Sequence, residues 1–132
     1  MKITADTNVL LRAILRDDPA QARAAEKVLR TATLVAFPLP CLCELVWVLD
    51  RLYEFDRETI CHVLETLCNA PNVVIDRAAV DAGLTMLKAG GDFADGAIAY
   101  EGAWLGAETF VSFDKKAVAL LDKLGQKTRL LG

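Results

Sequence analysis

The stretch ITADTNVLLR, residues 3–12, passes from a short apolar run through the acidic residue Asp6 into apolar residues at helical spacing. Residues 3–5 predict a β-strand that ends at Asp6, and residues 9–15 predict a helix. Asp6 then follows the carboxyl end of a strand, where an acid either caps the next helix or forms part of a pocket. The stretch alone leaves both alternatives open.

The same order of strand and helix recurs along the chain. Further strands are predicted at 33–37, 72–76, 108–112 and 128–131. Helices are predicted at 19–31, 41–53, 56–69, 77–88, 93–104 and 115–124. Strands separated by helices predict an α/β fold with a mostly parallel central sheet of about five strands, flanked by helices. In such a sheet the ligand crevice lies beyond the carboxyl ends of the strands.

The composition predicts one compact domain, residues 1–132, because 54% hydrophobic and 25% charged residues are sufficient for a buried core. The net charge of −3 argues against a protein-wide basic surface for nucleic acid. Nucleic-acid binding would have to be local or assisted by a metal ion. The first residues lack the apolar segment of a signal peptide, and no run reaches the roughly 20 apolar residues of a membrane span. We therefore expect a soluble, cytoplasmic protein that does not bind membranes.

The cysteines and the one histidine argue against two kinds of site. Cys41, Cys43, Cys61 and Cys68 form no CxxC pair, and His62 is the only histidine, so a structural zinc site is not expected. Nothing else points to Ser-His-Asp chemistry at His62. We expect the cysteines to be buried reduced thiols that pack in the core, and His62 to lie on a helix surface or an interface.

Five acidic residues are not fully explained as solvated helix faces. Local roles exist for them, since Asp6, Asp92 and Asp114 can cap helices and Glu44 can serve the first turn of its helix. Asp92 and Asp95 are spaced i,i+3, so both can point from one opening turn toward the same space. Glu44 lies within an apolar helix, where a buried charge would need water, a cation or a hydrogen-bonding pocket.

Four of these acids also form a pattern, because Asp6, Glu44, Asp95 and Asp114 occur at the starts of helices that follow strands or turns on one presumed edge of the sheet. Carboxylates gathered there would repel one another and raise their pKa values unless a divalent cation neutralised them. Oxygen ligands suit Mg²⁺ or Mn²⁺. Such a metal can activate water against a phosphoryl group, so the pattern predicts phosphodiester hydrolysis.

Four motifs in order resemble those of a known family: ADTNVLLR (5–12), ELVWVL (44–49), DFADGAIA (92–99) and FVSFDKKA (110–117). Together they are similar to the motifs of PIN-domain ribonucleases, in particular the VapC-type toxins of type II toxin–antitoxin modules. The resemblance covers essentially the whole chain. It implies the PIN-domain fold, with a mostly parallel sheet of five strands and helices on both faces.

The resemblance also implies a set of site residues. Carboxylates would hold one or two Mg²⁺ or Mn²⁺ ions and activate water against an RNA phosphate; these catalytic and metal-binding acids are Asp6, Glu44, Asp95 and Asp114. Asp92 would be an auxiliary, outer-sphere ligand. Asn8 resembles the residue that braces the first acid, and Ser112 takes the usual Ser or Thr place near the pocket. Gly96 stands where relatives often carry Ala or Cys, and we expect no loss of chemistry from it.

Partners follow from the same resemblance. Family members form homodimers and are silenced by a small cognate antitoxin, and the substrate would be tRNA or another structured RNA. Apolar residues that fit either ordinary core or an antitoxin groove or dimer face are Leu11, Ile14, Leu15, Trp47 and Leu52. Basic residues that fit either RNA phosphate contacts or a solvated surface are Arg12, Arg16, Lys115 and Lys116.

Other functions remain open on the sequence. A haloacid-dehalogenase-like phosphatase would also place an Asp after the first strand, but the DTN stretch lacks that family's second Asp two residues on. A receiver domain would carry its phosphoacceptor at the end of a middle strand, where only Asp76 is present. A non-catalytic PIN-like scaffold would bind a partner without using its acids. Neither phospho-transfer alternative requires Glu44.

Overall fold

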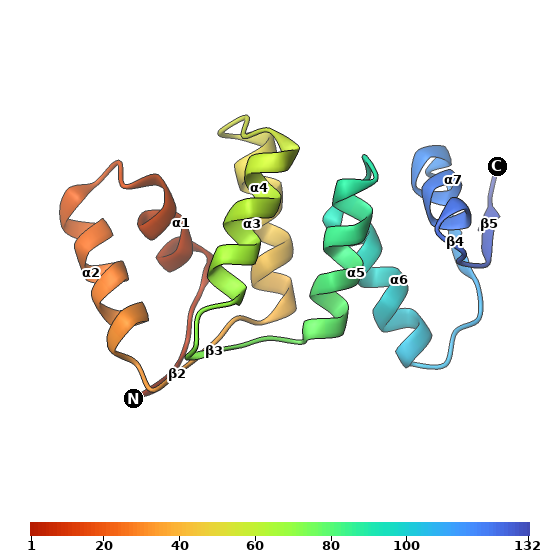
Figure 1. Cartoon of the computed structure of the whole chain (residues 1–132). Helices are drawn as coiled ribbons and strands as arrows, with labels where there is room; N and C mark the ends of the chain where they lie inside the picture. The colour runs from red at the N-terminus through yellow and green to blue at the C-terminus, as the bar shows by residue number, and fades with distance from the viewer. The chain divides into compact units, whose positions relative to one another are not determined.

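The computed structural model describes all residues, 1–132, and divides into two compact units, Met1–Asp76 and Arg77–Gly132. Figure 1 labels their elements. The first unit contains β1 (Lys2–Thr4), α1 (Thr7–Leu15), α2 (Pro19–Thr31), β2 (Leu34–Ala36), α3 (Leu39–Arg51), α4 (Arg57–Cys68) and β3 (Val73–Val74). The second contains α5 (Arg77–Lys88), α6 (Phe93–Trp104), β4 (Phe110–Ser112), α7 (Lys115–Lys123) and β5 (Thr128–Leu130).

The strands form two small parallel sheets. In the first unit β2 lies between β1 and β3, with Val35 opposite both Ile3 and Val73. In the second unit β4 pairs with β5. The α/β class with parallel strands is therefore confirmed, and all five predicted strands are present. The predicted single central sheet of about five strands is not confirmed. The backbone hydrogen bonds of β4 go to β5, and none of them joins the three-stranded sheet.

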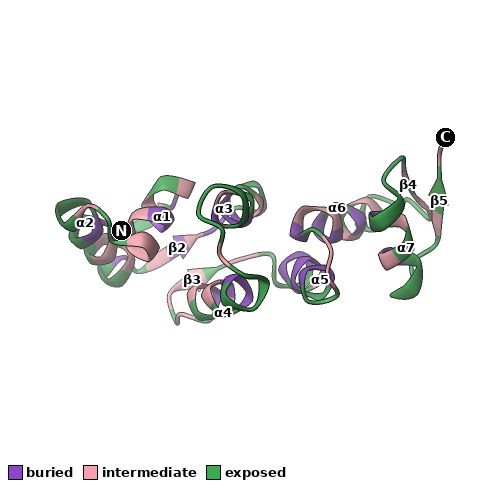
Figure 2. Ribbon diagram, turned by 90° about the horizontal axis from the view of Figure 1, so that it is seen from above, coloured by how far each residue is buried: buried purple, intermediate pink, exposed green.

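The core of the first unit lies between its helices and its sheet. Leu42, Leu45 and Leu49 recur at helical spacing on α3 and are fully buried, and α3 packs against α1 and α4. Val35 of the central strand is also fully buried. Figure 2 shows the buried positions concentrated on the inner faces of these helices. This packing sets the positions of the start of α1 and the second turn of α3, where two candidate acids lie.

Helix α3 begins two residues earlier than the sequence pattern predicted. Pro38 is the N-cap residue of α3, and Pro40 lies in the first turn. Proline is tolerated there because the first N–H groups of a helix have no intrahelical acceptor. The earlier start shifts Glu44 from the first turn to the second.

The apolar residues considered for a partner surface divide between the core and the surface. Leu11 is buried, which confirms the ordinary-core alternative for this residue, and Ile14 and Leu15 are half-buried. Trp47 and Leu52 on and beside α3 are 54% and 64% exposed. These two residues alone of the five remain on an open surface.

No helix of the chain has the length and apolar character needed to cross a bilayer.

Two glycines allow α5 and α6 to pack closely in the second unit. A Cβ atom on Gly96 would lie 2.5 Å from the Ala82 carbonyl oxygen, and one on Gly83 would lie 2.6 Å from the Phe93 ring. Phe93 and Met86 are fully buried beside them. Figure 2 shows buried residues along both helices. The position of α6, which carries two candidate acids, is therefore fixed by direct contact with α5.

Gly96→Ala is expected to destabilise the protein by about 1–3 kcal/mol, because the added methyl group meets backbone atoms that cannot rotate away. Helix propensity opposes this by about 1 kcal/mol at most. Gly102→Ala, on the same helix, is the matched control, since no atom lies within 4 Å of its Cβ position. The free energy of unfolding in urea measures both variants. Equal stability of the two variants would contradict the close helix contact.

Candidate functional site

Three of the candidate acids are helix N-caps. Asp6, Asp92 and Asp114 precede α1, α6 and α7, and each accepts a hydrogen bond of 3.1 Å from a backbone N–H group of the first turn. The capping alternative is therefore confirmed for all three. A cap occupies one oxygen of a carboxylate that has two oxygens and about four lone-pair sites. Capping thus holds these carboxylates in place while leaving them further acceptor capacity.

In the first unit, Asp6 and Glu44 lie close enough to act on one thiol. The pKa of Cys41 is raised, most strongly by burial and then by the negative charges of Asp6 and Glu44, while a hydrogen bond from Thr7 opposes the rise. The Thr7 hydroxyl donates to Cys41 Sγ at 3.6 Å, across 34 residues of sequence. This contact joins the start of α1 to the start of α3. The structure therefore brings the two acids of this unit to one region.

The sequence did not identify Thr7 or Cys41 as part of this region. All four cysteines were expected in the core, and Cys61 and Cys68 are indeed buried. Cys41 and Cys43 are only half-buried, and none of the four cysteines forms a disulfide. The position of Cys41 three residues before Glu44, on the same face of α3, was the signal in the sequence. His62 is exposed on α4, which confirms its predicted place on a helix surface.

The position and the exposure of Glu44 differ from those predicted. Glu44 lies in the second turn of α3 and is exposed, so it does not serve the first turn of the helix, and no acid does. Trp47, one turn further on, is also exposed. Glu44 is therefore a solvated carboxylate beside the Cys41 region, and its charge needs no pocket to offset burial.

An open groove of about 660 Å³ runs between α1 and α2. Its lining combines an acid, an amide, a cation and an apolar wall: Asp6, Asn8, Val9, Arg12, Gln21, Ala24, Ala25 and Val28. Asn8 is exposed in this wall, and the hydrogen bond that Asp6 accepts comes from the Val9 N–H rather than from Asn8. Asp6 is thus the one candidate metal ligand in the groove. A smaller cavity of about 150 Å³ in the second unit is lined by none of the candidate acids.

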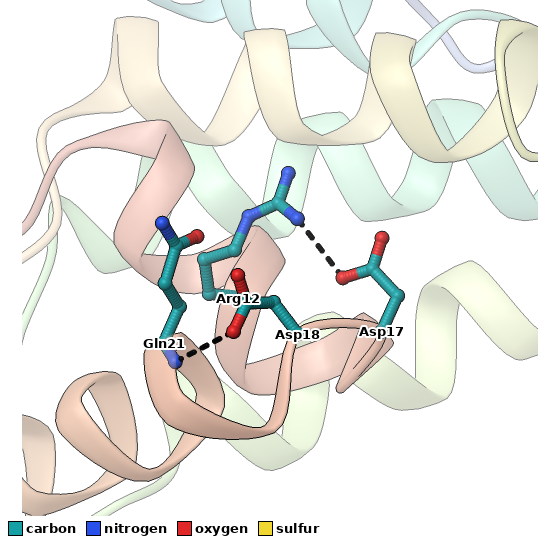
Figure 3. A network of polar contacts seen from close by, with 4 residues as sticks. All are labelled: Arg12, Asp17, Asp18 and Gln21. Atoms are coloured by element: carbon teal, nitrogen blue, oxygen red, sulfur yellow. Dashed lines mark hydrogen bonds and ion pairs between the residues drawn. The ribbon is translucent and has the colours of Figure 1, made fainter.

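Acidic partners hold both arginines considered for RNA binding. Figure 3 shows Arg12 reaching from α1 to Asp17, at 2.9 Å, while Asp18 accepts a hydrogen bond from the Gln21 N–H and caps α2. Arg16, which ends α1 in a left-handed conformation, pairs with Glu26. These ion pairs fix the turn between α1 and α2. RNA would have to compete for both guanidinium groups.

In the second unit, the charges of two aspartates act on a third. The pKa of Asp95 is raised, first by burial and then by the negative charges of Asp92 and Asp114. Asp92 and Asp95 come from the start of α6, and Asp114 follows β4. Ser112 Oγ accepts a hydrogen bond of 3.0 Å from the Asp114 N–H. Asp95 and Asp114, two of the four predicted ligands, therefore lie near each other in this unit with Asp92 and Ser112, while Asp6 and Glu44 belong to the first unit.

The donor chemistry of these aspartates fits Mg²⁺ or Mn²⁺, although the chain contains no group of three or more His, Cys, Asp or Glu side chains placed to hold one ion. Mg²⁺ is usually bound by one or two carboxylates, and water and substrate phosphates complete its shell. Asp95 with one neighbouring aspartate meets that requirement. A closed cage of protein ligands, as for structural Zn²⁺, is not formed.

Comparison with protein-family models found no match to this sequence, and comparison with curated proteins found none.

Proposed function

We propose that this chain is a metal-dependent endoribonuclease that hydrolyses RNA phosphodiester bonds, like the VapC-type toxins of the PIN-domain family. The observation that carries the proposal is the half-buried Asp95 carboxylate near Asp92 and Asp114, whose pKa is raised first by burial and then by the charges of these two neighbours. Grouping like charges costs stability. Such a group is typical of a site that binds a cation, and its oxygen donors favour Mg²⁺ or Mn²⁺.

The proposed roles of the acids are those that the resemblance implies, and each acid is assigned within the unit to which it belongs. When bound, Mg²⁺ or Mn²⁺ would supply an activated water and stabilise negative charge on the phosphoryl group. Asp95, with Asp92 as an auxiliary, and Asp114 are the proposed ligands of the second unit. Asp6 and Glu44 are the proposed ligands of the first. The backbone hydrogen bonds of the capping acids keep these carboxylates oriented before any ligand binds.

The proposed partners are an RNA substrate, a cognate antitoxin and a second copy of the chain. The α1–α2 groove supports the antitoxin, since its apolar wall suits a peptide with apolar residues. Exposed Trp47 and Leu52 support a protein contact on α3. Lys115 and Lys116, exposed beside Asp114, support contacts with RNA phosphates.

Cleavage of labelled tRNA and total RNA tests the proposal. We expect the antitoxin-free protein to produce discrete cuts with Mn²⁺ or Mg²⁺ and none in excess EDTA. We also expect Glu44→Gln to slow cleavage by about 10-fold or more, because it removes a metal-binding charge. Glu44 is exposed, so this substitution leaves the fold intact.

The same variant separates the alternatives. A haloacid-dehalogenase-like phosphatase would hydrolyse p-nitrophenyl phosphate at one Asp, with Glu44→Gln fully active. A non-catalytic scaffold would show neither activity, and its partner binding would survive replacement of the acids. Folded protein that leaves RNA intact with both metals would overturn the nuclease proposal.

A further inference from the structure

The Phe113 side chain is 74% exposed, and Phe113 directly precedes Asp114 of the aspartate group in the second unit. A large aromatic side chain in water gives up the stabilisation that burial would provide, about 25 cal/mol per Å² of apolar surface. Its place in the chain, between Ser112 and Asp114, explains how it is held there. The Asp114 N–H donates to Ser112 Oγ, and Asp114 in turn caps α7 through the Ala117 N–H. These two hydrogen bonds fix the backbone on either side of Phe113.

Basic residues are close to this aromatic in the sequence, and one lies on the strand paired with β4. Residues 115–132 contain five of the 15 Lys and Arg residues of the chain but one of its 18 Asp and Glu residues. Lys115 and Lys116 directly follow Asp114 and are exposed. Arg129, also exposed, lies opposite Val111 in the β4–β5 register. An acidic protein thus carries a local basic segment next to its aspartate group.

An exposed aromatic with cations around it is the combination that binds single-stranded nucleic acid. Bases stack on the ring, and phosphates contact the cations. A protein partner of acidic character would use the cations as well, but it would have no requirement for a flat ring. The adjoining aspartates would repel an acidic partner, whereas an RNA phosphate brought to a metal site needs them.

We propose that Phe113 is a substrate-positioning residue whose ring stacks on an unpaired RNA base while Lys115 and Lys116 contact the adjoining phosphates. This inference rests on the proposed nuclease function and adds that the substrate is single-stranded at the bound position. The stack sets which phosphate lies beside Asp114 and Asp95. Phe113 touches the substrate without taking part in the chemistry.

The test measures binding of a fluorescein-labelled single-stranded RNA by fluorescence anisotropy in EDTA, where no cleavage occurs. We expect Phe113→Ala to weaken binding by about 5- to 100-fold, the range of one lost base stack. Phe113→Trp is expected to bind as the unchanged protein does, and Phe113→Leu to bind as weakly as Phe113→Ala. With Mn²⁺ present, Phe113→Ala is expected to raise KM and leave kcat nearly unchanged.

Trp104→Ala is the matched control. Trp104 is 81% exposed in the same unit, and it ends the helix that begins beside Asp92. It follows Asp95 by nine residues of helix, which places it about 14 Å further along the axis. Its loss is expected to leave RNA binding unchanged. An equal loss in both alanine variants would overturn the stacking role, because a general apolar effect would then explain it.

The remaining outcomes separate this inference from the proposed function. Cleavage and binding by Phe113→Ala equal to those of the unchanged protein would overturn the inference alone. Full binding by Phe113→Leu would also overturn it, since an aliphatic side chain cannot stack. An unchanged protein that neither binds nor cuts RNA would overturn the proposed function, and the inference with it.

Discussion

Asp6→Asn is expected to slow metal-dependent RNA cleavage by at least about 100-fold, the equivalent of the several kcal/mol that a metal ligand contributes to the transition state. Asparagine caps helices about as well as aspartate does, so the hydrogen bond from the Val9 N–H has a replacement acceptor. The free energy of unfolding should therefore change by less than about 0.5 kcal/mol. The variant removes the charge and retains the cap.

Asp18→Asn provides the control for this experiment. Asp18 caps α2 in the same unit, with the Gln21 N–H as its donor, and is not one of the candidate acids. Initial rates of cleavage of a labelled RNA with Mn²⁺, and urea unfolding of both variants, complete the comparison. A similar loss of cleavage in both variants, or full activity in Asp6→Asn, would show that Asp6 acts only as a helix cap.

Asp95→Asn is expected to abolish cleavage and to stabilise the fold. Burial and the charges of Asp92 and Asp114 raise the pKa of Asp95, so its ionised form is disfavoured in the folded protein. These effects outweigh the favourable position of Asp95 in the first turn of α6. Replacement by neutral Asn removes the repulsion. An increase on the order of 1 kcal/mol in the free energy of unfolding is expected near neutral pH.

The raised pKa of Asp95 also predicts how the free energy of unfolding changes with pH. Because the folded pKa of Asp95 is raised, the unfolded chain releases the proton first as the pH rises, and folding stability falls. The fall begins near the unfolded value of about 3.9 and ends above the folded pKa. Asp95→Asn should therefore gain its advantage over this acidic range and keep it at neutral pH. Glu101→Gln, at an exposed position of the same helix, should show no such gain. A variant less stable than the unchanged protein at neutral pH would contradict the prediction.

Local sequence signals predicted the elements well. The bounds of α2, α5 and α6 agree with the predictions, because Asp18 with Pro19, and Asp92 with the preceding glycines, give clear stop and start signals. The start of helix α3 was predicted two residues too late, because a proline can both end a strand and begin a helix. The pairing of strands into two sheets could not be predicted, since strands of two or three residues carry little information about their partners.

The candidate site was predicted in part. Caps and spacing identified Asp92, Asp95 and Asp114, and the structure brings them together in one unit. The exposure of Glu44 was not predicted, because apolar neighbours in sequence do not fix which face of a helix a residue occupies. The contact of Thr7 with Cys41 joins segments 34 residues apart, and no local pattern reports such a contact.

The close approach of α5 and α6 limits which substitutions this sequence can accept during evolution. Side-chain volume at Gly83 or Gly96 is excluded by neighbouring atoms whether or not the protein is active. Asp95 differs from these glycines, because burial and repulsion disfavour its charge in the folded protein. Stability therefore does not favour an aspartate here, and the proposed metal-binding function would be the reason to retain it. In a lineage that no longer needs the activity, Asp95 would be among the first residues replaced. Gly83 and Gly96 would be retained for longer, because the packing of the two helices requires them.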